Sequence, residues 1–433
     1  MSHSRRAVTA LVLLVLMAGF GIGVNRYLAS RTTSINTPAK NPTTEAPQFT
    51  LPGAVYFADN GGLYALNGTS ITQLQAQGQG WSDPVALPGG AGLLAVKTTA
   101  NYYSDLYELS LTGAVQQQLS HDSSSQVTAT DQSKDDWIYY PAIGPDNTLY
   151  FAYDWPKQGQ CDPGNGYEVD MSIWETTLGS TDIDRGNVQG SKGITLQAWA
   201  NYYTGGDANP VPLAGGGLIY SDYESAYSLL SGASPGDEIS QIRMDPKVGP
   251  PDNPSDCPRA NDGTALTQPQ DDCAQPSLNA SQTVIAMVCT PVVGGAPSST
   301  EADLVVATFD AQTATIGPLD RIVTGTMVAS PVWSPDGQDL LYEAPESGDG
   351  YFQLWYLKGA AGDAETAAAA ATPSASGTAS AGGTPQAAPT STATPAHSAT
   401  RTPAPAAAPA APKQVTMNLD LDGSAPAWVS AGS

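Results

Sequence analysis

The chain has 433 residues and a formal net charge of −24, from 41 acidic and 17 basic side chains. So acidic a chain repels a phosphate backbone, which excludes nucleic acids as the expected partner and is typical of solubility outside the cell. Gly (44) and Pro (35) are frequent and only 13% of the residues are charged, a composition that favours short strands joined by many turns.

The N-terminus consists of a short basic segment, residues 1–6, and an apolar run, residues 7–24. This run is about as long as the shortest helix that spans a bilayer, and the basic residues before it favour a cytoplasmic N-terminus. We therefore expect an uncleaved signal anchor and a single-pass protein of the cell membrane, with cleavage and secretion as the alternative. Both place the rest of the chain on the extracytoplasmic side. Residues 25–50 are rich in Thr, Pro and Asn and are predicted to be a linker.

A repeated unit fills residues 51–359. Its clearest copy is Ser330–Gly337 followed by Gln338–Tyr342, in which Pro335-Asp336-Gly337 is a tight-turn signal between two short apolar strands. Other copies begin at Pro84, Pro141, Pro210 and Pro276. A third strand and a more polar fourth strand follow each hairpin, as in Asp105–Leu109 and Val115–Leu119. Four antiparallel strands per unit predict the blades of a β-propeller.

The first unit has strands two to four, at Ala54–Phe57, Leu63–Leu66 and Ile71–Leu74, but no Pro-led first strand. Near the C-terminus, Ala425–Val429 resembles the first strand of the last unit and has no hairpin partner of its own. We expect it to complete the first blade, so that both ends of the chain share one sheet and no edge is exposed. The predicted fold is all-β, a six-bladed propeller closed by a C-terminal strand.

The repeat resembles the WD40-like (PD40) repeat of TolB-type propellers, most closely at residues 330–342 and less closely at 141–151 and 276–286. The resemblance implies a six-bladed ring. TolB-type proteins carry an α/β domain before the propeller, for which this chain has no room, so the resemblance does not extend to their role in the envelope.

Residues 360–413 consist almost entirely of Ala, Pro, Ser, Thr and Gly, which bury too little apolar surface to offset the entropy of ordering. We predict a disordered loop between the third strand of the last blade and residues 414–431, which supply the last strand of blade 6 and the closing strand of blade 1. Such a composition suits either O-glycosylation or a spacer in the cell wall. The alternation of Val415, Met417, Leu419 and Leu421 with polar residues predicts a strand with one wet face.

Four cysteines without a C-x-x-C pair favour two disulfides in an oxidising compartment over a zinc site. Cys273 and Cys289 flank a hairpin at equal distances from its turn, which predicts a bond between them. Cys161 then pairs with Cys257; a Cys257–Cys273 bond is the main alternative.

The sequence contains partial matches to two functional motifs but no complete one. Gly232–Gly236 fits G-x-S-x-G, but a strand pattern follows it and Pro235 has no N–H to donate to an oxyanion. Asn418–Gly423 resembles the start of an EF-hand loop, yet its twelfth position would be Val429 rather than the required Glu. We expect no enzyme activity, no metal and no cofactor.

Long aromatic and acidic loops join strand two to three and blade to blade, on one face of the predicted ring. Tyr and Trp are favoured anchors of recognition surfaces, although such rings can also pack against their own loops. The predicted ligand-binding face contains Tyr102, Tyr103, Asp154, Trp155, Trp199, Tyr202, Tyr203, Asp222, Tyr223 and Glu224.

The sequence thus predicts a monomeric binding or scaffold propeller for a protein, peptide or glycan. A carbohydrate- or peptide-processing enzyme that uses carboxylates of the propeller face is the alternative, and a sensor domain that signals through the membrane helix is a third. A buried carboxylate pair near the channel, with no basic partner, would favour the enzyme.

Overall fold

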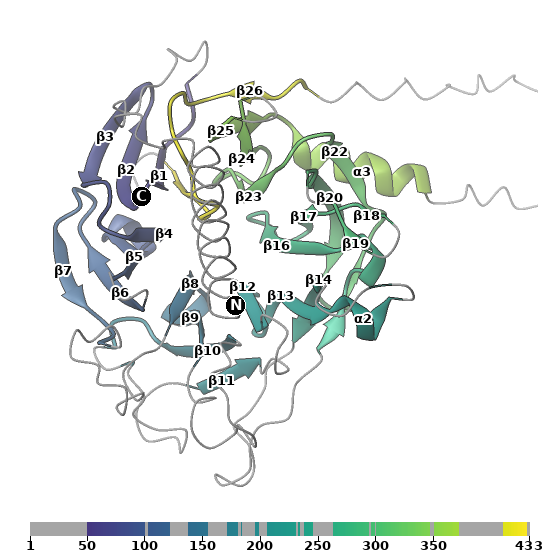
Figure 1. Cartoon of the computed structure of the whole chain (residues 1–433), viewed down its shortest axis with the longest axis horizontal. Coiled ribbons are helices and arrows are strands. Elements are labelled where there is room, and N and C mark those ends of the chain that lie inside the picture. The colour runs from purple at the N-terminus through teal and green to yellow at the C-terminus, as the bar shows by residue number, and fades with distance from the viewer. Residues whose placement is uncertain are drawn as a thin grey trace, which may run out of the picture. The chain divides into compact units, whose positions relative to one another are not determined.

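The computed structural model forms a ring of six small antiparallel sheets (Figure 1). It describes residues 50–99, 103–121, 137–154, 171–180, 183, 195–198 (backbone alone), 206–230, 233, 238–245, 263–293, 296–298, 300–346, 350–371 and 410–430. The predicted anchor, the linker and most of the low-complexity segment lie outside these residues. Within them, no helix is both long and apolar enough to cross a membrane.

Each blade has its first strand next to the central channel and its last strand at the rim (Figure 1). From the channel outward, blades 1 to 3 consist of β27 (Ala427–Val429), β1 (Ala54–Asp59), β2 (Gly62–Asn67) and β3 (Ser70–Gln75); β4 (Trp81–Ala86), β5 (Leu93–Thr98), β6 (Ser104–Leu109) and β7 (Val115–Gln118); and β8 (Ile138–Ile143), β9 (Thr148–Tyr153), β10 (Ser172–Thr177) and β11 (Thr195–Ala198).

Blades 4 to 6 follow the same plan with small additions. They consist of β12 (Gly206–Pro212), β13 (Leu218–Ser225), β14 (Glu238–Asp245) and β15 (Thr264–Ala265); β16 (Cys273–Leu278), β17 (Val284–Cys289) and β20 (Asp303–Asp310), with β21 (Thr315–Ile316) and β22 (Asp320–Val323) both on β20; and β23 (Ala329–Trp333), β24 (Leu340–Pro345), β25 (Phe352–Leu357) and β26 (Lys413–Gln414). The short helix α2 (Ala226–Leu229) follows β13, and β18 (Val292–Val293) pairs with β19 (Ala296–Pro297) between β17 and β20.

The C-terminal strand closes the ring as predicted. β27 pairs antiparallel with β1, with Trp428 opposite Val55. The Trp428 indole Nε1 donates to the carbonyl oxygen of Pro52 at 2.7 Å, and its ring lies edge-on to Tyr356 of blade 6. This strand therefore joins the first blade to the last.

The hydrophobic core lies between the blades. Every neighbouring pair of blades shares at least one cluster of buried side chains; between blades 5 and 6, for example, Val306 and Leu304 pack with Trp333 and Tyr342. The predicted Pro335-Asp336-Gly337 turn is present, with Gly337 at φ 71° and its N–H bonded to the Ser334 carbonyl oxygen at 2.7 Å. A Cβ on Gly337 would lie 3.0 Å from the Ala280 nitrogen of blade 5, so this turn fits closely against its neighbour.

Two sequence predictions in the C-terminal region were wrong. Residues 360–371, assigned to the disordered loop, form helix α3 (Ala360–Ala371), because Ala360, Ala361 and Ala364 are buried in the core between blades 5 and 6. Residues 415–422 are not a regular strand, because Asn418 has a φ of 58° and interrupts the ladder. The predicted alternation is still visible, since Leu419 and Leu421 are buried while the aspartates beside them are exposed.

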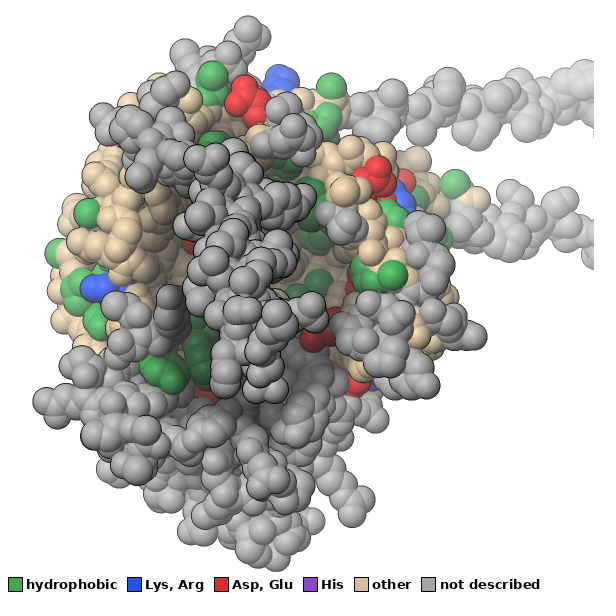
Figure 2. Space-filling view, in the orientation of Figure 1, with side chains coloured by type: hydrophobic (Ala, Val, Ile, Leu, Met, Phe, Trp, Pro, Cys, Tyr) green, Lys and Arg blue, Asp and Glu red, His purple; other side chains and the backbone are tan. Residues whose placement is uncertain are grey.

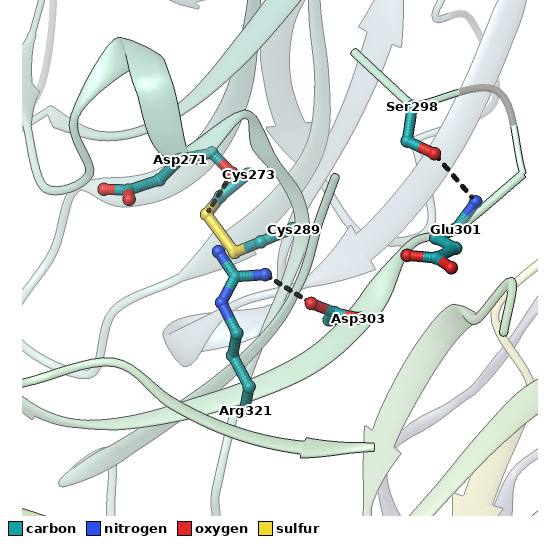
Figure 3. A network of polar contacts seen from close by, with 7 residues as sticks. All are labelled: Asp271, Cys273, Cys289, Ser298, Glu301, Asp303 and Arg321. Atoms are coloured by element: carbon teal, nitrogen blue, oxygen red, sulfur yellow. Dashed lines mark hydrogen bonds and ion pairs between the residues drawn. A yellow bond between two sulfur atoms is a disulfide. The ribbon is translucent and has the colours of Figure 1, made fainter. Parts of the chain in front are cut away.

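The Cys273–Cys289 disulfide is confirmed and joins directly opposed residues of β16 and β17 (Figure 3). Asp303, at the start of the next strand, accepts a charge-assisted hydrogen bond from Arg321 of β22 (Figure 3). Blade 5 is thus held together at one end by a covalent bond and an ion pair. Cys161 and Cys257 lie outside the described residues, so their pairing stays a prediction.

Candidate functional site

The inner strands of five blades contain the same backbone feature. The residue that precedes the proline of each strand adopts a left-handed conformation, with φ between 47° and 53°; these residues are Asp83, Tyr140, Asn209, Gln275 and Ser330. At each of them the pairing with the second strand shifts register, which identifies a β-bulge. Non-glycine residues in this region are strained. Because the same conformation recurs at five equivalent positions around the ring, it is part of the architecture of the channel.

Hydrogen bonds connect these residues from blade to blade. The carboxylate of Asp83 accepts the backbone N–H of Tyr140, and the Gln275 side-chain oxygen accepts the N–H of Ser330 at 2.7 Å. Between them, Ser221 accepts the Gln275 N–H at 2.9 Å and donates to Asn209 at 3.2 Å. The Ser330 hydroxyl donates to the carbonyl oxygen of Gly423, beyond which the ring closes. The side chains before four of the prolines, those of Asp83, Asn209, Gln275 and Ser330, therefore help to fix the width of the channel.

A cavity of about 310 Å³ lies within this ring. It is lined by one Xaa-Pro pair from each blade, namely Asp83-Pro84, Tyr140-Pro141, Asn209-Pro210, Gln275-Pro276, Ser330-Pro331 and Ala425-Pro426. Val85, Val211, Val332 and Trp428 complete a mostly apolar wall. This volume is at the lower end of the range for small-ligand sites, which suits a slender ligand or an inserted side chain.

Carboxylates gather where the chain closes the ring, and we call this group the acidic end: Asp59, Asp83, Glu343, Asp420 and Asp422. Asp59 is the last residue of β1, and its Oδ1 accepts the Asp420 N–H at 2.6 Å. Glu343 lies in the second half of β24, and its Oε2 accepts the Gly423 N–H at 3.1 Å. Second strands end at the loops that join strands two and three, so the acidic end lies toward the predicted ligand-binding face.

Burial and mutual repulsion raise the pKa values of Asp83, Glu343, Asp420 and Asp422. Burial, reinforced by the charge of Asp422, raises the pKa of Asp83 to about 7. Burial raises the pKa of Glu343 well above its ordinary value, with further contributions from Asp422 and Asp83. Asp422 has an exposed side chain, but enough protein surrounds it that desolvation raises its pKa as well. The neutral, protonated forms of Asp83 and Glu343 are therefore favoured up to a higher pH than in an exposed carboxyl group.

The described residues of the predicted binding face have structural contacts. Asp154 is fully buried and its Oδ1 accepts the Trp137 N–H at 2.8 Å, so it offers no exposed surface to a ligand. The Tyr103 ring packs on Trp137 with centroids 4.9 Å apart. Asp222 is 6% exposed and forms an ion pair with Arg243 of β14.

Tyr223 and Glu224 are half-buried at the end of β13, and desolvation raises the pKa of Tyr223 to about 12. Tyr102, Trp155, Trp199, Tyr202 and Tyr203 lie outside the described residues. Sequence reasoning missed Glu343 and the rest of the acidic end, and it missed the residues that line the channel. For the channel, the available signal was the residue before each repeated proline, which stands at the same structural position in five blades.

Figure 2 shows only scattered Lys and Arg side chains on the viewed face, as expected for an acidic chain. Among the described residues, no group of three His, Cys, Asp or Glu side chains is arranged to hold a metal ion. The site as described is therefore an apolar channel with a carboxylate end.

Known proteins share little sequence with this chain. No protein-family model matches the sequence, and no curated protein matches it. Similar solved structures include TolB from Acinetobacter baumannii (14% identity, 71% of this chain, TM-score 0.41), Kuenenia stuttgartiensis hydrazine synthase (12%, 72%, 0.43) and a Mycobacterium tuberculosis puromycin-hydrolysing peptidase (12%, 64%, 0.36). This chain spans 61%, 44% and 36% of their lengths, respectively. The described part of the chain is a six-bladed β-propeller, and TolB is among its structural neighbours.

Proposed function

We propose that this protein is an extracytoplasmic binding propeller, held at the membrane by residues 7–24, whose ligand enters the central channel. The observation that carries the proposal is the cavity that all six blades line with equivalent residues. The Cys273–Cys289 disulfide supports an oxidising compartment, in which such bonds persist. A peptide or protein segment is the favoured ligand, because a narrow apolar channel admits an extended chain or one side chain more readily than a branched glycan.

A substitution that fills the channel tests this proposal. Ala425 lines the cavity and is exposed, so Ala425→Trp occupies the space without disturbing the core. Ala114→Trp is the matched control, because Ala114 is exposed in the turn before the outer strand β7. Partners of the full-length protein would be captured from the cell envelope by chemical cross-linking and identified by mass spectrometry. Partners lost from Ala425→Trp but kept by Ala114→Trp support the channel, whereas equal capture by both variants contradicts it.

Catalysis is a second candidate, because Asp83 and Glu343 are a buried carboxyl pair beside the channel without a basic partner among the described residues, which is the arrangement expected to favour an enzyme. Burial raises the pKa of Asp83, at the wall of the cavity, to about 7. Such a group suits general acid or base catalysis on a peptide or glycan. Hydrolysis of peptide and oligosaccharide libraries by wild type, abolished in Asp83→Asn, would support this alternative. Activity that survives in Asp83→Asn would exclude it.

A further inference from the structure

The five carboxylates of the acidic end have no basic partner among the residues the structure describes. The ion pairs of the described residues, Arg243–Asp222 and Arg321–Asp303, lie instead in blades 4 and 5. At the acidic end, the protein's hydrogen-bond donors are neutral: backbone N–H groups, the hydroxyls of Ser82 and Ser424, and the amide of Gln77. A buried carboxylate is stable only when it is protonated or compensated by a positive charge.

Glu343 shows that this compensation is incomplete. Its side chain is 1% exposed, and its Oε1 is buried without any hydrogen-bond partner. The same carboxyl group faces the turn at Asp422–Ser424, since its Oε2 accepts the Gly423 N–H and its charge interacts with those of Asp422 and Asp83. An unsatisfied buried oxygen costs about 1–3 kcal/mol. This oxygen is therefore an acceptor available to a donor that the chain itself does not provide.

Glu343 lies beside the cavity rather than in its wall. Asp83 and Gly423 line the cavity; the Gly423 N–H donates to Glu343, and the charge of Asp83 acts on it. The rest of the wall is mainly proline, valine and alanine, so a ligand that reaches Asp83 has an unbranched apolar stem. Anions are repelled, and the described carboxylates are not arranged for a metal ion. The complementary group is compact, positively charged and rich in hydrogen-bond donors.

We propose that the acidic end of the channel binds the primary ammonium group of a slender aliphatic chain, as found on a lysine side chain or a free alkylamine. This inference rests on the proposed function, because it names the chemistry that the channel accepts. An ammonium group has three donors on one compact centre, which can contact Asp83 and Glu343 together. The titratable groups around this site are Asp59, Asp420, Asp422 and the phenol of Tyr140, none of which is basic. Binding therefore displaces protons from the carboxyls.

Isothermal titration of the full-length protein in detergent tests the proposal with three probes: 1-pentylamine, the neutral 1-pentanol, and the peptide acetyl-Gly-Lys-Gly-amide. At pH 8 the amines remain protonated, and we expect 1-pentylamine to bind at least about tenfold more tightly than 1-pentanol. Its affinity falls about tenfold between pH 8 and pH 5.5, because protons then compete for the same carboxyls. The tighter of the two amines identifies the source as a free amine or a peptide side chain.

Variants separate this site from general attraction to an acidic protein. Asp83→Asn and Glu343→Gln each lower the affinity for 1-pentylamine at least about fivefold. Glu365→Gln, which removes an exposed carboxylate from helix α3, leaves the affinity unchanged and is the matched control for Glu343→Gln. Melting temperatures of the unliganded variants establish that each one is folded.

Three results would overturn the inference: equal binding of 1-pentylamine and 1-pentanol, equal loss of affinity in Glu365→Gln, or binding of calcium chloride in preference to either amine. The channel proposal is judged separately by the capture of partners with Ala425→Trp. If that variant loses partners while amines do not bind, the channel is the site and the ammonium assignment is wrong. If amines bind but Ala425→Trp retains every partner, the assignment stands and the proposed function fails.

Discussion

Two groups of buried acids differ in what neutralises them. Asp222 in blade 4 and Asp303 in blade 5 each face an arginine, Arg243 and Arg321. Asp83 and Glu343, on opposite sides of the ring closure, have only neutral donors and other acids around them. The first arrangement is the usual way to stabilise a buried carboxylate, and it fixes neighbouring strands. In the second arrangement no positive charge of the described residues offsets the carboxylates, which is expected where a ligand supplies that charge.

The largest expected effect breaks the first group. Arg243→Ala leaves Asp222, which is 6% exposed, without its counter-charge and lowers the free energy of unfolding by about 3 kcal/mol. Arg321→Ala costs only about 1 kcal/mol, because the Arg321 side chain is 35% exposed and water replaces part of the lost interaction. Urea unfolding of both variants at pH 7 measures the difference. Equal losses would show that burial does not set the strength of these pairs.

Removing the charges of the second group, Asp83 and Glu343, is expected to raise the free energy of unfolding above neutral pH rather than to lower it. The pKa of Asp83 is raised from 3.8 to about 7, and that of Glu343 is raised well above its ordinary value of 4.5. A raised pKa stabilises the fold below the pKa of the unfolded chain, and this stabilisation is lost as the pH rises through the folded value. The contribution of Asp83 to stability therefore falls between about pH 4 and pH 7, and that of Glu343 falls as the pH rises above about 4.5.

The double variant Asp83→Asn/Glu343→Gln removes this part of the pH dependence. We expect it to be more stable than wild type at pH 8 by about 2 kcal/mol, and no more stable at pH 4. Thermal unfolding across this range gives both curves, and Glu365→Gln controls for the general effect of net charge. A double variant that is less stable than wild type at pH 8 would mean that the two acids are structural, like Asp222.

Much of this architecture could be predicted from the repeated prolines. Their spacing located the inner strands, and the unpaired segment around Trp428 predicted the closure of the ring. Helix α3 could not be predicted from composition, because alanine becomes a core residue only where a neighbouring blade covers it. The bulges were missed for a similar reason. A left-handed Tyr140 or Gln275 is locally unfavourable and is stabilised by hydrogen bonds between blades.

The acidic end was beyond sequence reasoning for a different reason. Asp59, Asp83, Glu343 and Asp422 are far apart in the chain, and they meet only because β27 returns to the first blade. Any sequence this acidic offers many such pairs. The predicted aromatic face failed for the opposite reason. Its residues are easily recognised in the sequence, but described ones such as Asp154 are buried by the surrounding structure.

The smallest expected effect concerns a neutral hydrogen bond at the ring closure. The Ser424 hydroxyl accepts the buried backbone N–H of Asp83 at 3.0 Å and thereby joins the closing segment to blade 2. Ser424→Ala leaves that N–H unsatisfied and lowers the free energy of unfolding by about 1 kcal/mol, as for one lost neutral hydrogen bond. Ser110→Ala, at an exposed turn of blade 2, is the control and changes stability by less than about half of that. Because the bond to Ser424 involves the backbone of Asp83, the loss persists in the Asp83→Asn background. If Ser424→Ala instead leaves the free energy of unfolding unchanged in the Asp83→Asn background, the hydroxyl interacts with the Asp83 carboxylate rather than with the backbone N–H. The ring closure then depends on the charge of Asp83.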